Sequence, residues 1–122
     1  MSEVITVNIP AKAEHLLVAR LAASGVCSRL GMAIEQMEDV KAAVSEACIL
    51  MINNQAGYSR LAVSFVYGNG LEVCVRGEEP GGMPVSEEID ADFSMALLAA
   101  LADEVQADAS QVCFSISGGA GL

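Results

Sequence analysis

Residues 59–76, SRLAVSFVYGNGLEVCVR, contain two alternating apolar runs separated by a turn sequence. Gly68-Asn69-Gly70 between the runs favours a hairpin, because Gly and Asn adopt positive φ at low cost. Each run directs its apolar side chains to one face, namely Leu61, Val63, Phe65 and Tyr67 in the first and Leu71, Val73 and Val75 in the second. The stretch therefore predicts two antiparallel strands that share one buried face.

Two helical patterns and a short strand precede this hairpin. Residues 4–9 alternate and predict a strand that ends at Pro10. The first helix is expected from Ala11 to about Leu30, with Gly31 at its end. It carries Leu17, Leu21, Ser24 and Ser28 at helical spacing. The second is expected from about Ile34 to Asn54, with a buried stripe of Met37, Val40, Val44, Ala47 and Met51.

After the hairpin, the composition changes. Residues 77–88 are polar and contain three Gly and two Pro, so no regular structure is expected there. A third helix is expected over about Asp90 to Glu104, and a last strand over residues 111–117. The apolar sides of these two elements are Phe93, Leu97, Ala100, Leu101 and Val105 for the helix, and Val112, Phe114 and Ile116 for the strand.

The resulting order is βααββαβ, an α+β fold. We expect one domain over residues 1–122, a two-layer sandwich in which three helices cover one face of a four-stranded, mostly antiparallel sheet. The other face of the sheet carries polar side chains and is expected to be wet. These are Arg60, Ser64, Glu72, Arg76, Ser115 and Ser117.

Composition excludes several classes of protein. Hydrophobic residues make up 53% of the chain and charged residues 18%, which excludes intrinsic disorder. The net charge of −10 argues against binding to nucleic acid or to an anionic membrane surface. No apolar run approaches the roughly 18 residues of a membrane span, and the N-terminus does not resemble a signal peptide, so a cytoplasmic protein is expected.

Cys27, Cys48, Cys74 and Cys113 are scattered, without a CxxC spacing or a nearby histidine. This pattern is typical of buried, reduced cysteines that act as small hydrophobic side chains, and no metal site is expected.

Several segments resemble the bacterial anti-sigma regulatory factors, small serine kinases of the GHKL (histidine-kinase-like) ATPase superfamily. The resemblance is carried by Ile9-Pro-Ala-Lys-Ala-Glu14, by residues 18–25 and 28–31, and above all by Glu38-Asp-Val-Lys-Ala-Ala-Val-Ser-Glu-Ala-Cys48. It implies the histidine-kinase-like ATPase fold, a homodimer, and partners that are a sigma factor or an anti-anti-sigma protein. Members of the family bind Mg-ATP and phosphorylate a serine of the anti-anti-sigma partner.

The chain departs from this family at the nucleotide motifs. By the resemblance, Glu46 matches the general base, and the asparagine that holds magnesium four residues later is replaced by Leu50. Leucine has no oxygen for a cation that demands near-octahedral oxygen ligands. The adenine-binding aspartate of the family falls at about Gly77, followed by Glu78.

A third departure lies at the start of the last helix. Where the family has a glycine-rich phosphate loop, this sequence has Ala91-Asp92-Phe93-Ser94, and Asp92 would repel a triphosphate. Taken together, the three departures predict a pseudokinase: a regulatory binding protein that controls transcription through protein–protein contacts, without a nucleotide cofactor. The alternatives are an active ATP-dependent serine kinase that uses Glu46, Glu78 and Asp92 with Mg-ATP, or a subunit of a larger signalling assembly.

For two residues on the predicted helices, both a functional and a non-functional interpretation remain open. Glu46 is interpreted as an inherited helix-face carboxylate beside Lys41 and Arg60, and acts as a base only if a nucleotide is bound. Arg20 matches a position at which some family members contact the sigma factor, so it is the candidate partner-binding residue; a solvated surface arginine is the alternative.

Overall fold

The computed structural model describes residues 3–54, 57–68, 70–81 and 91–117. The elements in chain order are β1 (Glu3–Pro10), the 3₁₀ turn η1 (Ala13–His15), α1 (Leu16–Arg29), α2 (Ile34–Ile52), β2 (Tyr58–Tyr67), β3 (Leu71–Pro80), α3 (Ala91–Leu101), β4 (Glu104–Ala107) and β5 (Gln111–Ile116). Within these residues, five strands form one antiparallel sheet in the order β1-β2-β3-β5-β4.

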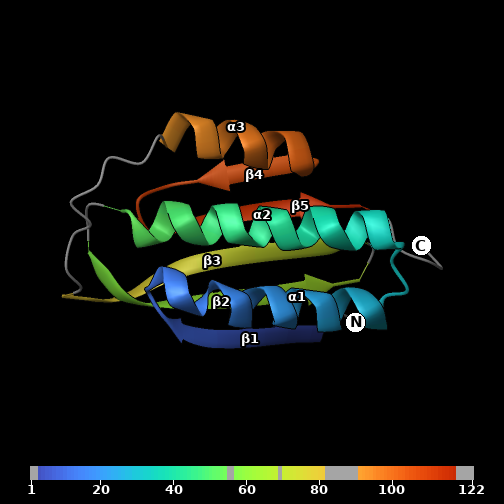
Figure 1. Cartoon of the computed structure of the whole chain (residues 1–122), viewed down its shortest axis with the longest axis horizontal. Coiled ribbons are helices and arrows are strands. Elements are labelled where there is room, and N and C mark those ends of the chain that lie inside the picture. The colour runs from blue at the N-terminus through green and yellow to red at the C-terminus, as the bar shows by residue number, and fades with distance from the viewer. Residues whose placement is uncertain (1–2, 55–56, 69, 82–90, 118–122) are drawn as a thin grey trace.

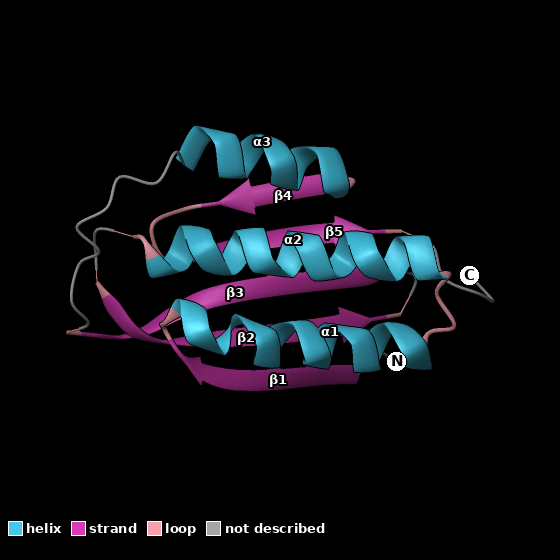
Figure 2. Cartoon of the chain, in the orientation of Figure 1, coloured by secondary structure: helices cyan, strands magenta, loops and turns pink. Residues whose placement is uncertain are grey.

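The helices of the described chain lie side by side in one layer on one face of the sheet, with α2 in the middle (Figures 1 and 2). The predicted α+β sandwich, with helices on one face, is therefore confirmed. None of the described helices is long and apolar enough to cross a membrane.

The strand count of four was wrong, because the third helix was predicted to run to about Glu104, with Val105 on its apolar side, and no strand was expected between that helix and Gln111. That helix ends at Leu101, and residues 104–107 pair with β5 as an edge strand. The turn between β4 and β5 is closed by Asp108, whose Oδ1 accepts hydrogen bonds from the backbone N–H of Ser110 at 2.7 Å and of Gln111 at 3.0 Å. Residues 104–107, EVQA, do alternate, but a run of four that directly follows an apolar helical pattern also fits the last turn of that helix.

The expected loop after residue 76 begins later than predicted. Gly77 to Pro80 continue β3 and pair with the start of β2, with Gly77 opposite Leu61 and Pro80 opposite Tyr58. Two neighbouring features explain the extension. An added Cβ at Gly77 would lie 2.2 Å from the Tyr58 ring, so the glycine leaves the space that the ring occupies. Arg60 Nη1 also forms an ion pair with Glu79 Oε1 at 3.0 Å. The predicted loop from 82 to 88, the turn residue Asn69 and the helix start at Asp90 lie outside the described residues.

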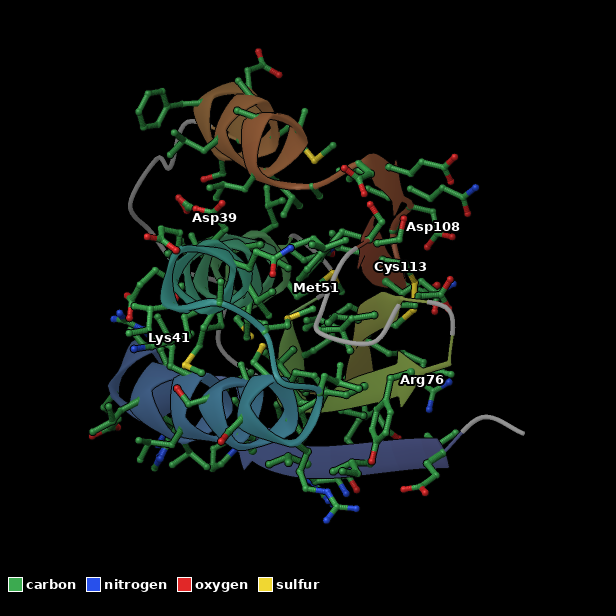
Figure 3. The ribbon with its side chains drawn as sticks, turned by 90° about the vertical axis from the view of Figure 1, so that its right-hand side faces the viewer. Asp39, Lys41, Met51, Arg76, Asp108 and Cys113 are labelled. Atoms are coloured by element: carbon green, nitrogen blue, oxygen red, sulfur yellow. A yellow bond between two sulfur atoms is a disulfide. The ribbon has the colours of Figure 1, made fainter. Side chains whose placement is uncertain are left out.

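The core lies between the layer of helices and the sheet, with α2 at its centre. The predicted apolar faces of β2, β3 and β5 are buried or half-buried, and so is the predicted stripe of α2. Figure 3 shows Met51 of α2 between the helices and the sheet, with Arg76 and Cys113 on the side of the sheet away from the helices. Gly31 ends α1 as predicted, since it adopts a φ of 68° and is followed by a backbone bond from Met32 N–H to the Cys27 carbonyl.

The spacing of apolar residues predicted that α1 and α3 are helices, but these residues are not the ones that the two helices bury. Leu17 and Leu21 of α1 are 62% and 61% exposed, and its buried side is formed by Ala19, Ala23, Val26 and Cys27. In α3, Phe93 is 59% exposed, whereas Ser94 and Leu98 are buried. Small side chains let α1 pack closely, so the sequence positions with the largest apolar residues are not the buried ones.

One cysteine pair departs from the prediction. The register of β3 and β5 places Cys74 opposite Cys113, with Cα atoms 4.1 Å apart, and their sulfurs form a disulfide. The expectation of four reduced cysteines was wrong for this pair, because strand pairing brings together residues 39 apart in the chain. Cys27 and Cys48 are free and buried, as predicted, and burial raises the pKa of their thiols to about 11 and about 12.

Candidate functional site

The outer face of α2 forms the floor of a cavity of about 510 Å³. Four residues at helical spacing, Ala42, Ser45, Glu46 and Ile49, line it from α2. The apolar stripe on the other side of α2 packs against the sheet, so the helix is held with this face outward. We call this space the helix cavity.

Neighbouring helices form the walls of the helix cavity. Arg20 contributes from α1, and Leu97, Ala100 and Leu101 contribute from α3. Its lining is therefore mainly aliphatic, with an arginine, a serine and a glutamate as the polar groups. A concave, mostly apolar site with a few polar groups is the usual form of a ligand site, and its volume falls in the usual range of about 300–1,000 Å³.

Two polar atoms at the floor of the helix cavity have no hydrogen-bond partner. Within the described residues, Ser45 Oγ and Glu46 Oε2 are buried and neither bonds to a protein group. A buried carboxylate oxygen that lacks a partner costs free energy, since it has lost its water without gaining a replacement bond. A residue that lines the helix cavity therefore holds an unsatisfied acceptor, and a rotation of its side chain would bring that oxygen within reach of a bound group.

The expected neighbours of Glu46 pair elsewhere. Lys41 Nζ lies 3.3 Å from Glu38 Oε1, and Arg60 forms its ion pair with Glu79 on β3. The interpretation of Glu46 as a carboxylate beside Lys41 and Arg60 was therefore wrong. Arg60 belongs to the sheet and projects from the face away from α2, which follows from strand alternation.

Leu50 follows Glu46 by four residues, so both lie on the same side of α2. Asp39, seven residues before Glu46, lies on this side too, and Figure 3 shows it on the side of α2 that faces α3. Leu50 is half-buried, packs against the hydrophobic core and does not line the helix cavity. This side of α2 thus offers the carboxylates of Asp39 and Glu46, and a hydrocarbon side chain, Leu50, one turn after Glu46.

The other candidate nucleotide positions lie apart from the helix cavity. Gly77 and Glu78 belong to β3, where Glu78 pairs in register with Arg60. Asp92 is exposed in the first turn of α3. None of the three is among the described residues that line the helix cavity, whereas Arg20 and Glu46 both are. Of the predicted site residues, the structure brings together only these two.

The metal-binding capacity of the described residues is limited. Among them, no group of three or more His, Cys, Asp or Glu side chains is arranged to hold a metal ion. A magnesium ion takes oxygen ligands, and Leu50 supplies none. The donor set on this side of α2 therefore does not fit the magnesium nucleotide that the family resemblance implies.

A second hollow, of about 500 Å³, lies at the end of the sheet near the β2–β3 turn. Its acidic residues include Glu72, Asp103 and Glu104, and no predicted site residue lines it. Ser117 donates hydrogen bonds from its hydroxyl and its backbone N–H to Asp103 Oδ2, both at 2.7 Å, and these bonds lower the pKa of that carboxyl. Of these three acids, Asp103 is thus held by Ser117, the residue that follows β5.

Sequence reasoning missed Ser45 and the aliphatic wall from α3. A serine in the middle of an alanine-rich helix was the available signal for Ser45, because Ser usually favours helix ends. The wall depends on how α3 packs beside α2, and the sequence places Leu97 only on the apolar side of the helix.

Several curated relatives of this chain are named serine-protein kinase RsbW. A serine-protein kinase RsbW of Bacillus thuringiensis (strain Al Hakam) and one of Bacillus cereus (strain ATCC 14579) are each 40% identical over 76 residues, which cover 60% of this chain and 48% of the relative. The chain thus matches about half the length of these relatives. The RsbW of Oceanobacillus iheyensis is 34% identical over 122 residues, covering 84% of this chain and 77% of that protein.

No protein-family model matches the chain. The match to the Oceanobacillus protein nevertheless spans most of both sequences and agrees with the observed fold. The chain therefore belongs to the family of the RsbW serine-protein kinases, the anti-sigma family that its sequence resembles.

Proposed function

We propose that this protein is a non-catalytic member of the RsbW family, a pseudokinase that regulates transcription by binding a sigma factor or an anti-anti-sigma protein. The observation that carries the proposal is Leu50, a half-buried hydrocarbon side chain that packs against the core where the family resemblance requires a magnesium ligand. A leucine at this position leaves the metal of a magnesium nucleotide without its protein oxygen.

Two further positions support the proposal. Gly77 accommodates the ring of Tyr58 within the sheet, so its lack of a side chain already has a structural explanation. Asp92 places a negative charge in the first turn of α3, where a triphosphate would otherwise benefit from the helix N-terminus. Both features argue against a nucleotide contact at these sites.

Arg20 is the residue proposed to contact the partner, and the functional unit is proposed to be a homodimer. Arg20 is exposed on α1, near the exposed side chains Leu17 and Leu21. An arginine next to exposed aliphatic groups is a common composition for the centre of a protein interface.

The second candidate function is an active ATP-dependent serine kinase that phosphorylates an anti-anti-sigma protein. The observation in its favour is the unpartnered Oε2 of Glu46, which matches the family's general base. The name of the relatives, serine-protein kinase, points the same way. Against it, neither Glu78 nor Asp92 lines the helix cavity with Glu46.

The two candidates differ in whether partner binding requires nucleotide. The sigma factor and the anti-anti-sigma protein encoded nearest to this chain would be purified and their affinities measured with and without Mg-ATP. We expect equal affinity under both conditions, and at least tenfold weaker binding by Arg20→Glu. Arg76→Glu, on the far side of the sheet (Figure 3), is the matched control and should bind as the wild type does.

The same mixtures would be incubated with ATP labelled on its γ-phosphate. Label on a serine of the partner would establish the kinase and end the proposal. Loss of binding by Arg76→Glu but not by Arg20→Glu would move the interface away from α1.

A further inference from the structure

We propose that the helix cavity binds an aliphatic cation: an ammonium or guanidinium group at the end of a hydrocarbon chain. The charged group of the ligand would contact Glu46 and Ser45, and its hydrocarbon chain would lie along the aliphatic walls of the helix cavity. The inference rests on the proposed function, because a kinase would use the neighbourhood of Glu46 for nucleotide.

The polar floor of the helix cavity selects a donor. Ser45 Oγ and Glu46 Oε2 are adjacent in sequence, and within the described chain neither has a hydrogen-bond partner. An ionised carboxylate only accepts hydrogen bonds, and a hydroxyl can accept as well. The terminal torsion of a glutamate is broad, so a small rotation can turn Oε2 toward the helix cavity.

A positively charged donor fits this floor better than a neutral one. Hydrogen bonds to an ionised acceptor are about twice as strong as neutral ones, and a cationic donor adds the Coulomb attraction between opposite charges. The ion pairs formed by described residues are Lys41–Glu38 and Arg60–Glu79, so no cation of the described chain forms an ion pair with Glu46. The net charge of −10 also raises the local concentration of cations around the protein.

Among the described residues, Arg20 is the one cation that lines the helix cavity, and its position limits where the charge of the ligand can lie. It is an exposed residue of α1, whereas Leu97, Ala100 and Leu101 line the opposite wall from α3. Arg20 would repel the charged end of the ligand, so that end is expected at Glu46. The hydrocarbon chain of the ligand is then expected along the α3 wall, away from the guanidinium.

The aliphatic walls of the helix cavity favour a ligand that has a hydrocarbon chain. Ile49 of α2 and the α3 wall residues present hydrocarbon, and burial of apolar surface favours binding by about fourfold for each fully buried methylene. A ligand of about five carbons reaches from the Glu46 carboxylate across one to two helical turns. A lysine side chain of a partner protein and a free alkylamine share this chemistry.

The test is a titration followed by the backbone amide NMR signals of the full chain. The probes are n-pentylammonium, 1-pentanol and pentanoate, which share a chain and differ in charge. We expect n-pentylammonium to shift the signals of residues 42–49 and 97–101, with at least tenfold higher affinity than pentanol and no binding of pentanoate. Equal affinity for pentanol and n-pentylammonium would overturn the proposal.

Single-residue variants test whether Glu46 and Ser45 contact the ammonium group. Glu46→Gln should weaken n-pentylammonium binding at least tenfold, and Ser45→Ala should weaken it severalfold. Glu35→Gln is the control, since Glu35 is an exposed glutamate in the first turn of the same helix, and it should bind within twofold of the wild type. The amide spectrum of each variant reports whether it is folded, and unchanged affinity in folded Glu46→Gln would contradict the proposal.

Two further titrations extend the experiment. The first distinguishes a lysine side chain of a partner from a free amine as the ligand, and the second distinguishes failure of this inference from failure of the proposed function. Binding of N-acetyl-lysine N′-methylamide as tight as that of n-pentylammonium indicates a lysine side chain of a partner; tenfold weaker binding indicates a free amine. Binding of Mg-ATP without binding of the amine would refute both proposals. Absence of binding by either would refute this inference alone.

Discussion

At the scale of the residue, Gly77 shows how one missing side chain fixes a neighbour. The ring of Tyr58 occupies the space of its absent Cβ, and the Tyr58 hydroxyl donates a hydrogen bond to the Ala109 carbonyl at 3.0 Å. The glycine thereby joins the start of β2 to the β4–β5 turn. In the sequence it was indistinguishable from a loop glycine, because the ring that requires it lies 19 positions earlier in the chain.

Substitution of Gly77 by alanine is expected to lower the free energy of unfolding by about 1–3 kcal/mol, since the new methyl group overlaps the ring. Denaturant unfolding measures the effect. Gly25→Ala is the matched control: nothing lies within 4 Å of its added Cβ, and an alanine inside α1 should stabilise by about 0.5–1 kcal/mol. If Gly77→Ala lowers the free energy of unfolding by the same amount in a protein that also carries Tyr58→Ala, overlap with the ring is not the cause of the destabilisation.

Asp103 provides a prediction of acid sensitivity. The Ser117 hydroxyl, and then the Ser117 backbone N–H, lower the pKa of this carboxyl below its unfolded value of about 3.9. A lowered folded-state pKa contributes stability above the unfolded pKa, and the contribution is lost as the pH falls through the folded value. Ser117→Ala should therefore reduce the loss of stability between pH 5 and pH 2, measured by urea unfolding. Identical pH profiles for variant and wild type would contradict this.

At the scale of the element, α3 illustrates which part of a helix prediction depends on neighbours. Its existence followed from the apolar spacing, but that spacing fits more than one face of a helix with so many alanines and leucines. Packing against α2 and β4 buries Ser94 and Leu98 and leaves Phe93 exposed. The strands were predicted more completely, since alternation leaves only two faces to choose between.

The observed face of α3 can be checked with two leucines that are adjacent in the chain. Leu98→Ala should destabilise the protein by about 2–5 kcal/mol, because Leu98 is fully buried and its removal leaves a cavity. Leu97→Ala should cost less than about 1 kcal/mol, because Leu97 is 37% exposed. Denaturant unfolding of both variants gives the comparison, and a reversed order would assign the buried side to the face predicted from sequence.

The pairing of β3 with β5 carries the second prediction at this scale. In the chain-entropy account, a disulfide that closes a loop of about 40 residues stabilises by about 4 kcal/mol. Added dithiothreitol should therefore lower the thermal midpoint of the wild type. The double variant Cys74→Ser/Cys113→Ser should start at the lower midpoint and not respond to the reductant, whereas a wild type that does not respond would contradict a stabilising disulfide.

At the scale of the whole molecule, the sequence was sufficient for the layer arrangement but not for the helix cavity. The order of elements, the buried faces of the central strands and the stripe of α2 follow from local periodicity. The helix cavity combines Arg20, Glu46 and Leu101 from three helices, and its polar floor depends on groups that fail to meet a partner. Which residues of different helices lie together, and which polar groups lack a partner, is decided only when the helices pack.

The central claim at this scale is that a family scaffold has kept its fold and lost the ligand set for magnesium nucleotide. Leu50 is the position on which the claim depends most, and the variant Leu50→Asn restores an oxygen one turn after Glu46. A comparison of the two proteins isolates that oxygen within an otherwise unchanged chain.

The most direct test is isothermal titration of the wild-type protein with ATP in the presence of magnesium. We predict no saturable heat up to millimolar nucleotide. Saturable binding with a micromolar Kd that is lost when magnesium is removed would contradict the claim.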